Sequence, residues 1–301
     1  MFTSNNPSST SNLESEAKAL ALIKSLLLQK WIDNKNGLVK DHSESFGHFY
    51  ERWLVDEDQN LADLRLAITQ LSQLNNESSQ SRIQQLVTKV MRHYEDYYRV
   101  KSSSIERDVI YMMNAPWLTH LENTFLWIGG WRVTITFHLL YSVVGLQFEA
   151  QLTDFLQGSI GTTRDLGSDL TSTQLIRIDE LQKETVRQER ELSETLASLQ
   201  ETIADSSLVQ LSHLATQLSW EGCDRYDSIN EQVKLNFRVK ENKLKQVFFK
   251  ADDLRLTTLK TVVDILSPIQ AAHFLIAAAE LHLRLNEWGH YNYNHHDDIG
   301  N

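Results

Sequence analysis

The distribution of proline constrains this chain more than any other feature. Only three prolines occur, Pro7, Pro116 and Pro268, so the long stretch between the last two contains none. Proline inside a helix costs about 3 kcal/mol, because it lacks an amide hydrogen and its ring clashes with the preceding turn. Glycine is also scarce, at 11 of 301 residues. Such a stretch permits long helices.

The apolar spacing agrees with helices. Leu192, Leu196, Leu199 and Ile203 follow one another at steps of four, three and four, which places them on one helical face. Strict alternation over a strand length is rare, and Asn36-Gly37 is the only asparagine–glycine turn. We therefore expect an all-α protein, a single multi-helix, bundle-like domain with short disordered tails.

Caps and breaks predict where the helices begin and end. The predicted helices cover residues 13–32, 46–74, 81–101, 105–114, one after Pro116, one from about 133, then about 172–205, 208–223, 228–266 and 268–289. Thr171 to Gln174 and Ser267 to Gln270 both have the pattern of a capping box, and Gly289 is expected to end the last helix in a left-handed conformation. We expect residues 158–172 to form a surface loop. We expect residues 1–41 to be an N-terminal extension with a disordered start and one helix, 42–289 one domain, and 290–301 a polar, His-rich tail.

Charge and cysteine content narrow the classes of protein. The formal net charge is −11, which argues against direct nucleic-acid binding through the overall field. A single cysteine, Cys223, rules out an internal disulfide framework, and its acidic neighbours disfavour a reactive thiolate.

No secretory signal is visible, and Arg132 and His138 interrupt the longest apolar stretch. We therefore expect a buried helix in that stretch and a nuclear or cytoplasmic protein.

The chain lacks the common catalytic and metal-binding motifs. The chain contains no H-E-x-x-H helix, no G-x-S-x-G elbow, no phosphate-binding glycine loop before Lys-Ser/Thr and no G-x-G-x-x-G fingerprint. The His-rich tail could bind a transition metal loosely, although a solvated tail is favoured. We expect a protein that is not an enzyme.

Three other features have a simple structural interpretation beside a functional one. Residues 232–250 carry six basic residues and one acidic residue, which fits calmodulin or an anionic membrane, although a core helix with a charged outer face is favoured. Arg132 needs a carboxylate partner, with Glu122 and Glu287 as candidates. Five tryptophans could form an aromatic box, although burial in the core is the simpler reading: Trp53, Trp117, Trp127, Trp131 and Trp288.

Several segments, in order along the chain, resemble one plant family. They are Phe49 to Leu54, His93-Tyr94 with Tyr97-Tyr98, Ala115 to Trp117, Leu121 to Arg132, Gln174 to Gln200, Ala251 to Arg255, Ile265 to Ala272 and Ala278 to Gly289. Over residues 42–289 the chain resembles the Delay of Germination domain. The resemblance implies a plant regulatory protein. The same domain forms the C-terminal half of TGA-type bZIP transcription factors, but this chain lacks their basic region and zipper, so direct DNA binding is not expected.

The resemblance also raises haem as a cofactor. Some relatives bind haem through histidines of the last helix, and His282 matches one such position. The residue one turn further on is Asn286, and an amide is a poor axial ligand. His273 lies about two and a half turns before His282 and cannot replace it. We expect no cofactor, and a buried, hydrogen-bonded His282 is favoured over a haem ligand.

The leading hypothesis is a non-catalytic interaction protein in seed dormancy or seed maturation, linked to abscisic acid signalling. The resemblance implies type 2C protein phosphatases as partners, and carboxylates between Asp179 and Glu201 are candidate contacts. The alternatives are a pollen aperture factor of the Inaperturate Pollen type at the plasma membrane, a transcription co-regulator that pairs with bZIP relatives, and a sensor holding haem or a lipid in its core. The sequence leaves a homo-oligomer open.

Overall fold

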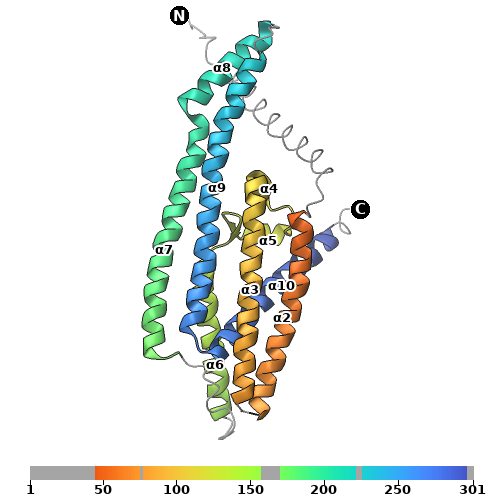
Figure 1. The fold of residues 1–301 in the computed structure, drawn as a ribbon, viewed down its shortest axis with the longest axis vertical. Helices are drawn as coiled ribbons and strands as arrows, with labels where there is room; N and C mark the ends of the chain where they lie inside the picture. The colour runs from red at the N-terminus through yellow and green to blue at the C-terminus, as the bar shows by residue number, and fades with distance from the viewer. Residues whose placement is uncertain (1–44, 75–76, 157–169, 222–225, 297–301) are drawn as a thin grey trace, which may run out of the picture. The chain divides into compact units, whose positions relative to one another are not determined.

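The computed structural model describes residues 45–74, 77–156, 170–221 and 226–296 (Figure 1). The helix expected at 13–32, most of the loop expected at 158–172 and Cys223 lie outside these ranges. Almost all described residues are helical, and the described β structure is one two-stranded hairpin, so the all-α expectation is confirmed. The described residues group into two compact units: a main unit of 45–196 with 244–296, and a second unit of 197–243.

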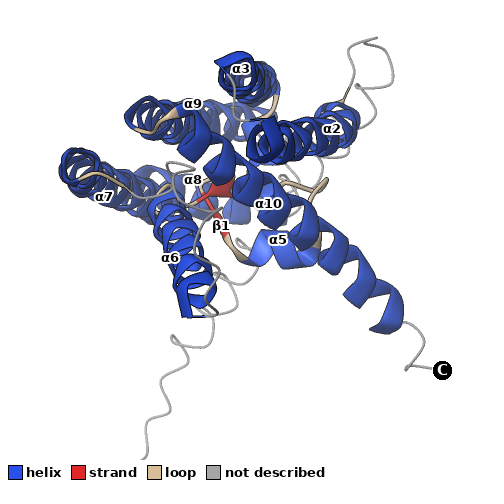
Figure 2. Ribbon diagram, turned by 90° about the horizontal axis from the view of Figure 1, so that it is seen from below, coloured by secondary structure: helices blue, strands red, loops and turns tan. Residues whose placement is uncertain are grey.

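The main unit is organised around its C-terminal helix. Helix α10 (Pro268–His296) packs against α2 (Phe46–Leu74) and α3 (Glu77–Arg107), which run side by side. It also contacts α5 (His120–Thr124) and α6 (Ile135–Leu156) (Figure 2). The remaining elements of this unit are α4 (Val109–Asn114), β1 (Leu126–Trp127), β2 (Gly130–Trp131), most of α7 (Ser172–Glu201) and the C-terminal part of α9 (Tyr226–Ile265).

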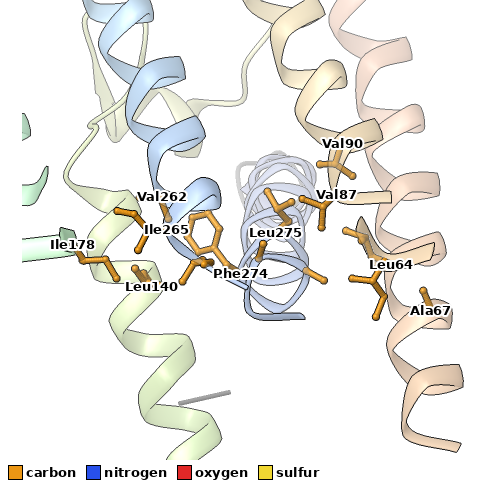
Figure 3. Packing of buried hydrophobic residues seen from close by; sticks show 14 of the residues in the cluster. Leu64, Ala67, Val87, Val90, Leu140, Ile178, Val262, Ile265, Phe274 and Leu275 are labelled. Atoms are coloured by element: carbon orange, nitrogen blue, oxygen red, sulfur yellow. The ribbon is translucent and has the colours of Figure 1, made fainter. Parts of the chain in front are cut away.

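The core of the main unit lies on two sides of α10. Phe274 and Leu275 project from α10, with Val262 and Leu140 on one side and Val87 on the other (Figure 3). These side chains are at most 2% exposed. Burying one such side chain stabilises the fold by roughly 1.5–3 kcal/mol, so this cluster fixes α10 among its neighbours.

Two predicted capping boxes are present and are joined to each other. The amide of Gln174 donates to Thr171 Oγ1 while Gln174 Oε1 accepts from the amide of Thr171. Ser267 and Gln270 make the same reciprocal pair at the start of α10. The side-chain amide of Gln174 also donates to Gln270 Oε1 at 2.8 Å, so the starts of α7 and α10 are held together.

The predicted end of the last helix is wrong. Helix α10 continues through Gly289 to His296, so residues 290–296, expected to follow the helix, are part of it. A Cβ at position 289 would lie 2.2 Å from Thr119 Oγ1, so this glycine is explained by close contact with the start of α5 and not by a left-handed cap. Trp288 of this helix, which was expected in the core, is 53% exposed.

The second unit is small and lightly packed. It contains the last residues of α7, a 3₁₀ turn (Thr202–Ala204), α8 (Ser206–Glu221) and the first part of α9. Leu211, Ala215 and Ile229 form its buried cluster. Lys240 donates to Asp205 Oδ2 and to the carbonyl of Thr202, which ties α9 to the start of α8. In the part of the chain that is described, no helix is long and apolar enough to cross a membrane.

Candidate functional site

His282, the residue singled out from the sequence, lies inside the main unit with both ring nitrogens engaged. Nδ1 is 3.0 Å from Glu57 Oε2, and Nε2 is 2.9 Å from the hydroxyl of Tyr50. Tyr94 donates from α3 to the other oxygen of Glu57 at 2.8 Å. The Glu57 side chain is 3% exposed and that of His282 16%. The contacts join α2, α3 and α10 through one buried network.

A second carboxylate extends this network to α5. Glu122 completes the capping box of α5, accepting from the amide and hydroxyl of Thr119. It also accepts from the Tyr50 hydroxyl at 3.2 Å and from the side-chain amide of Asn286 at 3.2 Å. Asn286, one turn after His282, is therefore a hydrogen-bond donor to Glu122.

The carboxylates set the protonation of their neighbours. Burial of the imidazole acts to lower the pKa of His282, but the charge and hydrogen bond of Glu57, with the charge of Glu122, raise it above its ordinary value. Burial and the nearby Glu122 carboxylate raise the pKa of Tyr50 far above that of a free phenol. Tyr50 therefore remains a neutral donor, and His282 keeps its proton to a higher pH than a free histidine does.

This arrangement does not fit haem coordination by His282. An axial ligand must offer the iron a ring nitrogen with a free lone pair. Here each nitrogen already has a hydrogen-bond partner, and the raised pKa of His282 acts against freeing a lone pair. Within the described residues, no group of three or more histidine, cysteine or carboxylate side chains is placed to hold a metal ion.

A second buried charge cluster joins α3 to α9. Lys101 Nζ and Arg255 Nη1 both donate to Asp252 Oδ1, at 2.8 and 2.6 Å. The side chains of Lys101, Arg255 and Asp252 are 1%, 6% and 9% exposed. Burial lowers the pKa of Lys101 to about 8, with the Asp252 carboxylate opposing that shift. Two cations thus converge on one oxygen of one carboxylate.

The same cations hold the hairpin, which the sequence pattern does not predict. Arg255 donates to the carbonyls of Trp127, Ile128 and Trp131, and Lys101 donates to that of Gly129. Ile128 and Gly129 form the two-residue turn with positive φ angles of 46° and 63°. Buried cations therefore fix this tight turn.

Between the two clusters lies a cavity of about 170 Å³. Its walls are mainly aromatic and apolar, and Lys101, Arg255 and His282 supply polar groups. The aromatic residues lining it are Trp53, Tyr94, Tyr97, Tyr98, Trp131 and Phe274. Trp53 also stacks on His93, with ring centroids 4.5 Å apart. Two of the five tryptophans therefore line a cavity, so simple core burial does not describe all of them.

Arg132 has a different partner from either one expected. It donates to Glu189 of α7 at 2.9 Å, and the other Glu189 oxygen accepts from the amide of Thr134. Glu122 is already engaged with Tyr50, Thr119 and Asn286, while Glu287 pairs with Arg284 at the surface. The Arg132 side chain is 53% exposed, so it does not carry the burial cost that the apolar surroundings suggested.

The basic segment 232–250 is partly built into the fold. Leu244, Val247 and Phe248 are at most 8% exposed, and Lys245 donates to the carbonyl of Glu106 at 2.6 Å. The core-helix interpretation therefore holds for residues 244–250. Calmodulin binding through 232–250 stays a prediction, and it would require this apolar face to leave the core.

Sequence reasoning missed the buried pairs because their partners are distant in the chain. Glu57 and His282 are separated by 225 positions, and Lys101 and Asp252 by 151. The available signal was a charged residue within an apolar or aromatic segment, as at Lys101 after Tyr97 and Tyr98. That signal indicates a buried charge but does not identify its partner.

Fold and site together define a class: an all-helical protein whose described interior uses charged side chains to join helices. Comparison with known proteins is more specific. A family model described as "DOG1: Seed dormancy control" matches residues 60–142. Protein DOG1-like 1 of Arabidopsis thaliana is 32% identical over 257 residues, spanning 80% of this chain and 87% of that protein.

Two further relatives extend the comparison. Protein ZW2 of Arabidopsis thaliana is 30% identical over 260 residues, spanning 83% of this chain and 99% of that protein. Transcription factor TGA2 of the same plant is 28% identical over 244 residues, covering 80% of this chain and 62% of TGA2. The chain belongs to the DOG1, or Delay of Germination, family, and the resemblance read from its motifs is confirmed. The names of these relatives point to regulation rather than enzymatic activity.

Proposed function

We propose that this chain is a non-catalytic regulatory protein of seed dormancy or seed maturation, linked to abscisic acid signalling. It acts by binding protein partners, and type 2C protein phosphatases are the partner class that we expect. Family membership supports the regulatory role. The nucleus and cytoplasm are the compartments in which such a partner would be met.

The observation that carries this proposal is the exposed, charged face of α7. One face of the helix is buried through Ile178, Thr185 and Glu189. The opposite face carries Asp179–Lys183 and Glu184–Arg187 ion pairs whose side chains are 49–74% exposed. Glu180 and Glu194 are also exposed. Exposed ion pairs contribute little to stability, so this face is available for recognition of a charged partner surface.

Affinity purification of the tagged chain from developing seeds, with mass spectrometry, tests the proposal. We expect a type 2C phosphatase to copurify with the natural chain and to be lost from a Glu180→Lys/Glu194→Lys variant. An Asp56→Lys/Asp58→Lys variant, with the same charge change on the exposed face of α2, is the matched control and should retain the phosphatase. Loss in both variants, or no phosphatase with the natural chain, contradicts the proposal.

The relatives favour one alternative function, a transcription co-regulator that pairs with intact bZIP factors, because the match to TGA2 spans most of this chain. Recovery of bZIP factors instead of a phosphatase would support that function. Expression in anthers instead of seeds, with membrane patterning factors among the copurifying proteins, would support the pollen aperture alternative.

A further inference from the structure

We propose that the aromatic cavity of the main unit binds a compact organic anion: a carboxylate carried on a single ring or a hydrocarbon group of similar size. The cavity lies among α2, α3, α6, α9 and α10, next to the hairpin, and all its lining residues belong to the main unit. This binding site is separate from the α7 face proposed for protein partners.

The volume of the cavity limits the size of the ligand. It measures about 170 Å³. An engineered cavity of about 150 Å³ in another protein binds benzene, so one ring with a small substituent matches the space. Haem and a fully enclosed long acyl chain are too large. Aromatic walls from Trp53, Trp131 and Phe274 favour a flat, apolar body.

On the hairpin side of the cavity the charge favours an anion, whereas the Glu57 and Glu122 carboxylates beyond His282 are already hydrogen-bonded within their own network. Lys101 and Arg255 both line it, whereas Asp252, their shared carboxylate partner, does not. The three side chains together carry one excess positive charge, and each is less than 10% exposed. Because an unbalanced buried charge is costly, a carboxylate bound beside Lys101 would offset this local excess of positive charge.

Lys101 is positioned to make the specific contact. Its ammonium group has three N–H donors. Two have acceptors in the structure, the carbonyl of Gly129 at 2.7 Å and Asp252 Oδ1 at 2.8 Å, which leaves one for a ligand oxygen. Most Arg255 donors are already directed at Asp252 and the hairpin carbonyls. A carboxylate in the cavity is therefore expected to contact Lys101.

Three probes that share one ring test the charge preference. Isothermal titration of the full chain with benzoate, benzamide and benzylammonium compares an anion, a neutral amide and a cation. Benzoate should bind at least about tenfold more tightly than the other two, as expected for a charge-assisted hydrogen bond in a buried site. Equal affinities for the three probes, or no binding of any of them at millimolar concentration, would overturn the proposal.

Two pairs of variants locate the site. Ala278→Leu fills the cavity and should abolish benzoate binding, while Ala277→Leu, on the same helix but outside the lining, should retain it. Lys101→Met should remove the preference for benzoate over benzamide, while Lys183→Met, at an exposed lysine, should not. Circular dichroism of each variant reports the helical fold. Unchanged benzoate binding by a folded Ala278→Leu variant would place any benzoate site elsewhere and contradict the proposal.

Discussion

At the scale of single residues, the main unit is distinguished by ionisable groups in its interior. Glu57, Lys101, Glu122 and Asp252 are each at most 7% exposed, and each has a partner on another element. An unpaired charge of this kind costs several kcal/mol, so the partners restrict which helices can meet. The sequence shows these residues but cannot show their pairing, as the wrong partners expected for Arg132 illustrate.

Asp252 should be one of the most sensitive positions in the chain. An Asp252→Asn substitution leaves Lys101 and Arg255 buried without their shared carboxylate. Loss of one partner from a buried ion pair typically costs about 3–5 kcal/mol in the free energy of unfolding. Urea denaturation monitored by circular dichroism measures this change. Asp179→Asn, which removes an exposed partner of Lys183, is the control and should have little effect; similar losses in both variants would contradict this account.

His282 should give the protein a pH-dependent stability. Because its folded-state pKa is raised, it stabilises the fold fully below the unfolded pKa of about 6.5 and loses that contribution as the pH rises through the folded pKa. The advantage of the natural chain over His282→Gln should shrink across that interval, by at most about 1.4 kcal/mol per pH unit for one proton. Urea unfolding of both proteins from acidic to alkaline pH measures it. A constant difference would show that His282 does not titrate as described.

At the scale of elements, helix boundaries were easier to predict than close contacts between elements. The capping boxes at Thr171 and Ser267 are local sequence signals, and both predictions are confirmed. The hairpin was missed because its strands have two residues each and depend on Arg255, more than a hundred residues away. The prediction of a left-handed cap at Gly289 was wrong for the same reason. The contact that excludes a side chain at this position is made by Thr119, which is distant in the sequence.

The hairpin turn gives a direct test at this scale. A Cβ on Gly129 would lie 2.4 Å from the buried ring of Phe248, and the residue has a φ of 63°. Gly129→Ala should therefore destabilise the protein by about 1–3 kcal/mol from backbone strain, with a further penalty from the clash. Gly145→Ala is the control, because its Cβ has no described neighbour within 4 Å and alanine favours a helix by about 1 kcal/mol. Thermal unfolding of both variants distinguishes them, and a neutral Gly129→Ala would contradict the strained turn.

At the scale of the whole molecule, helical class and family could be read from the sequence, because proline spacing, apolar periodicity and ordered motifs are properties of the chain itself. The cavity could not be predicted, because it is formed by residues of α2, α3, α6, α9, α10 and the hairpin that meet only in the folded unit. His282 was identified from its motif, but its role as a hydrogen-bonded link between Glu57 and Tyr50 required the structure.

The central claim, that this chain regulates by binding a type 2C protein phosphatase, is tested most directly with two purified proteins. Calorimetric titration should show binding at micromolar or lower concentration, together with a change in phosphatase activity on a phosphopeptide. The Glu180→Lys/Glu194→Lys variant should bind at least about tenfold more weakly, since reversed charges on a contact face oppose association. The Asp56→Lys/Asp58→Lys control should bind like the natural chain. Absence of binding by the folded natural chain to phosphatases of this class would contradict the account.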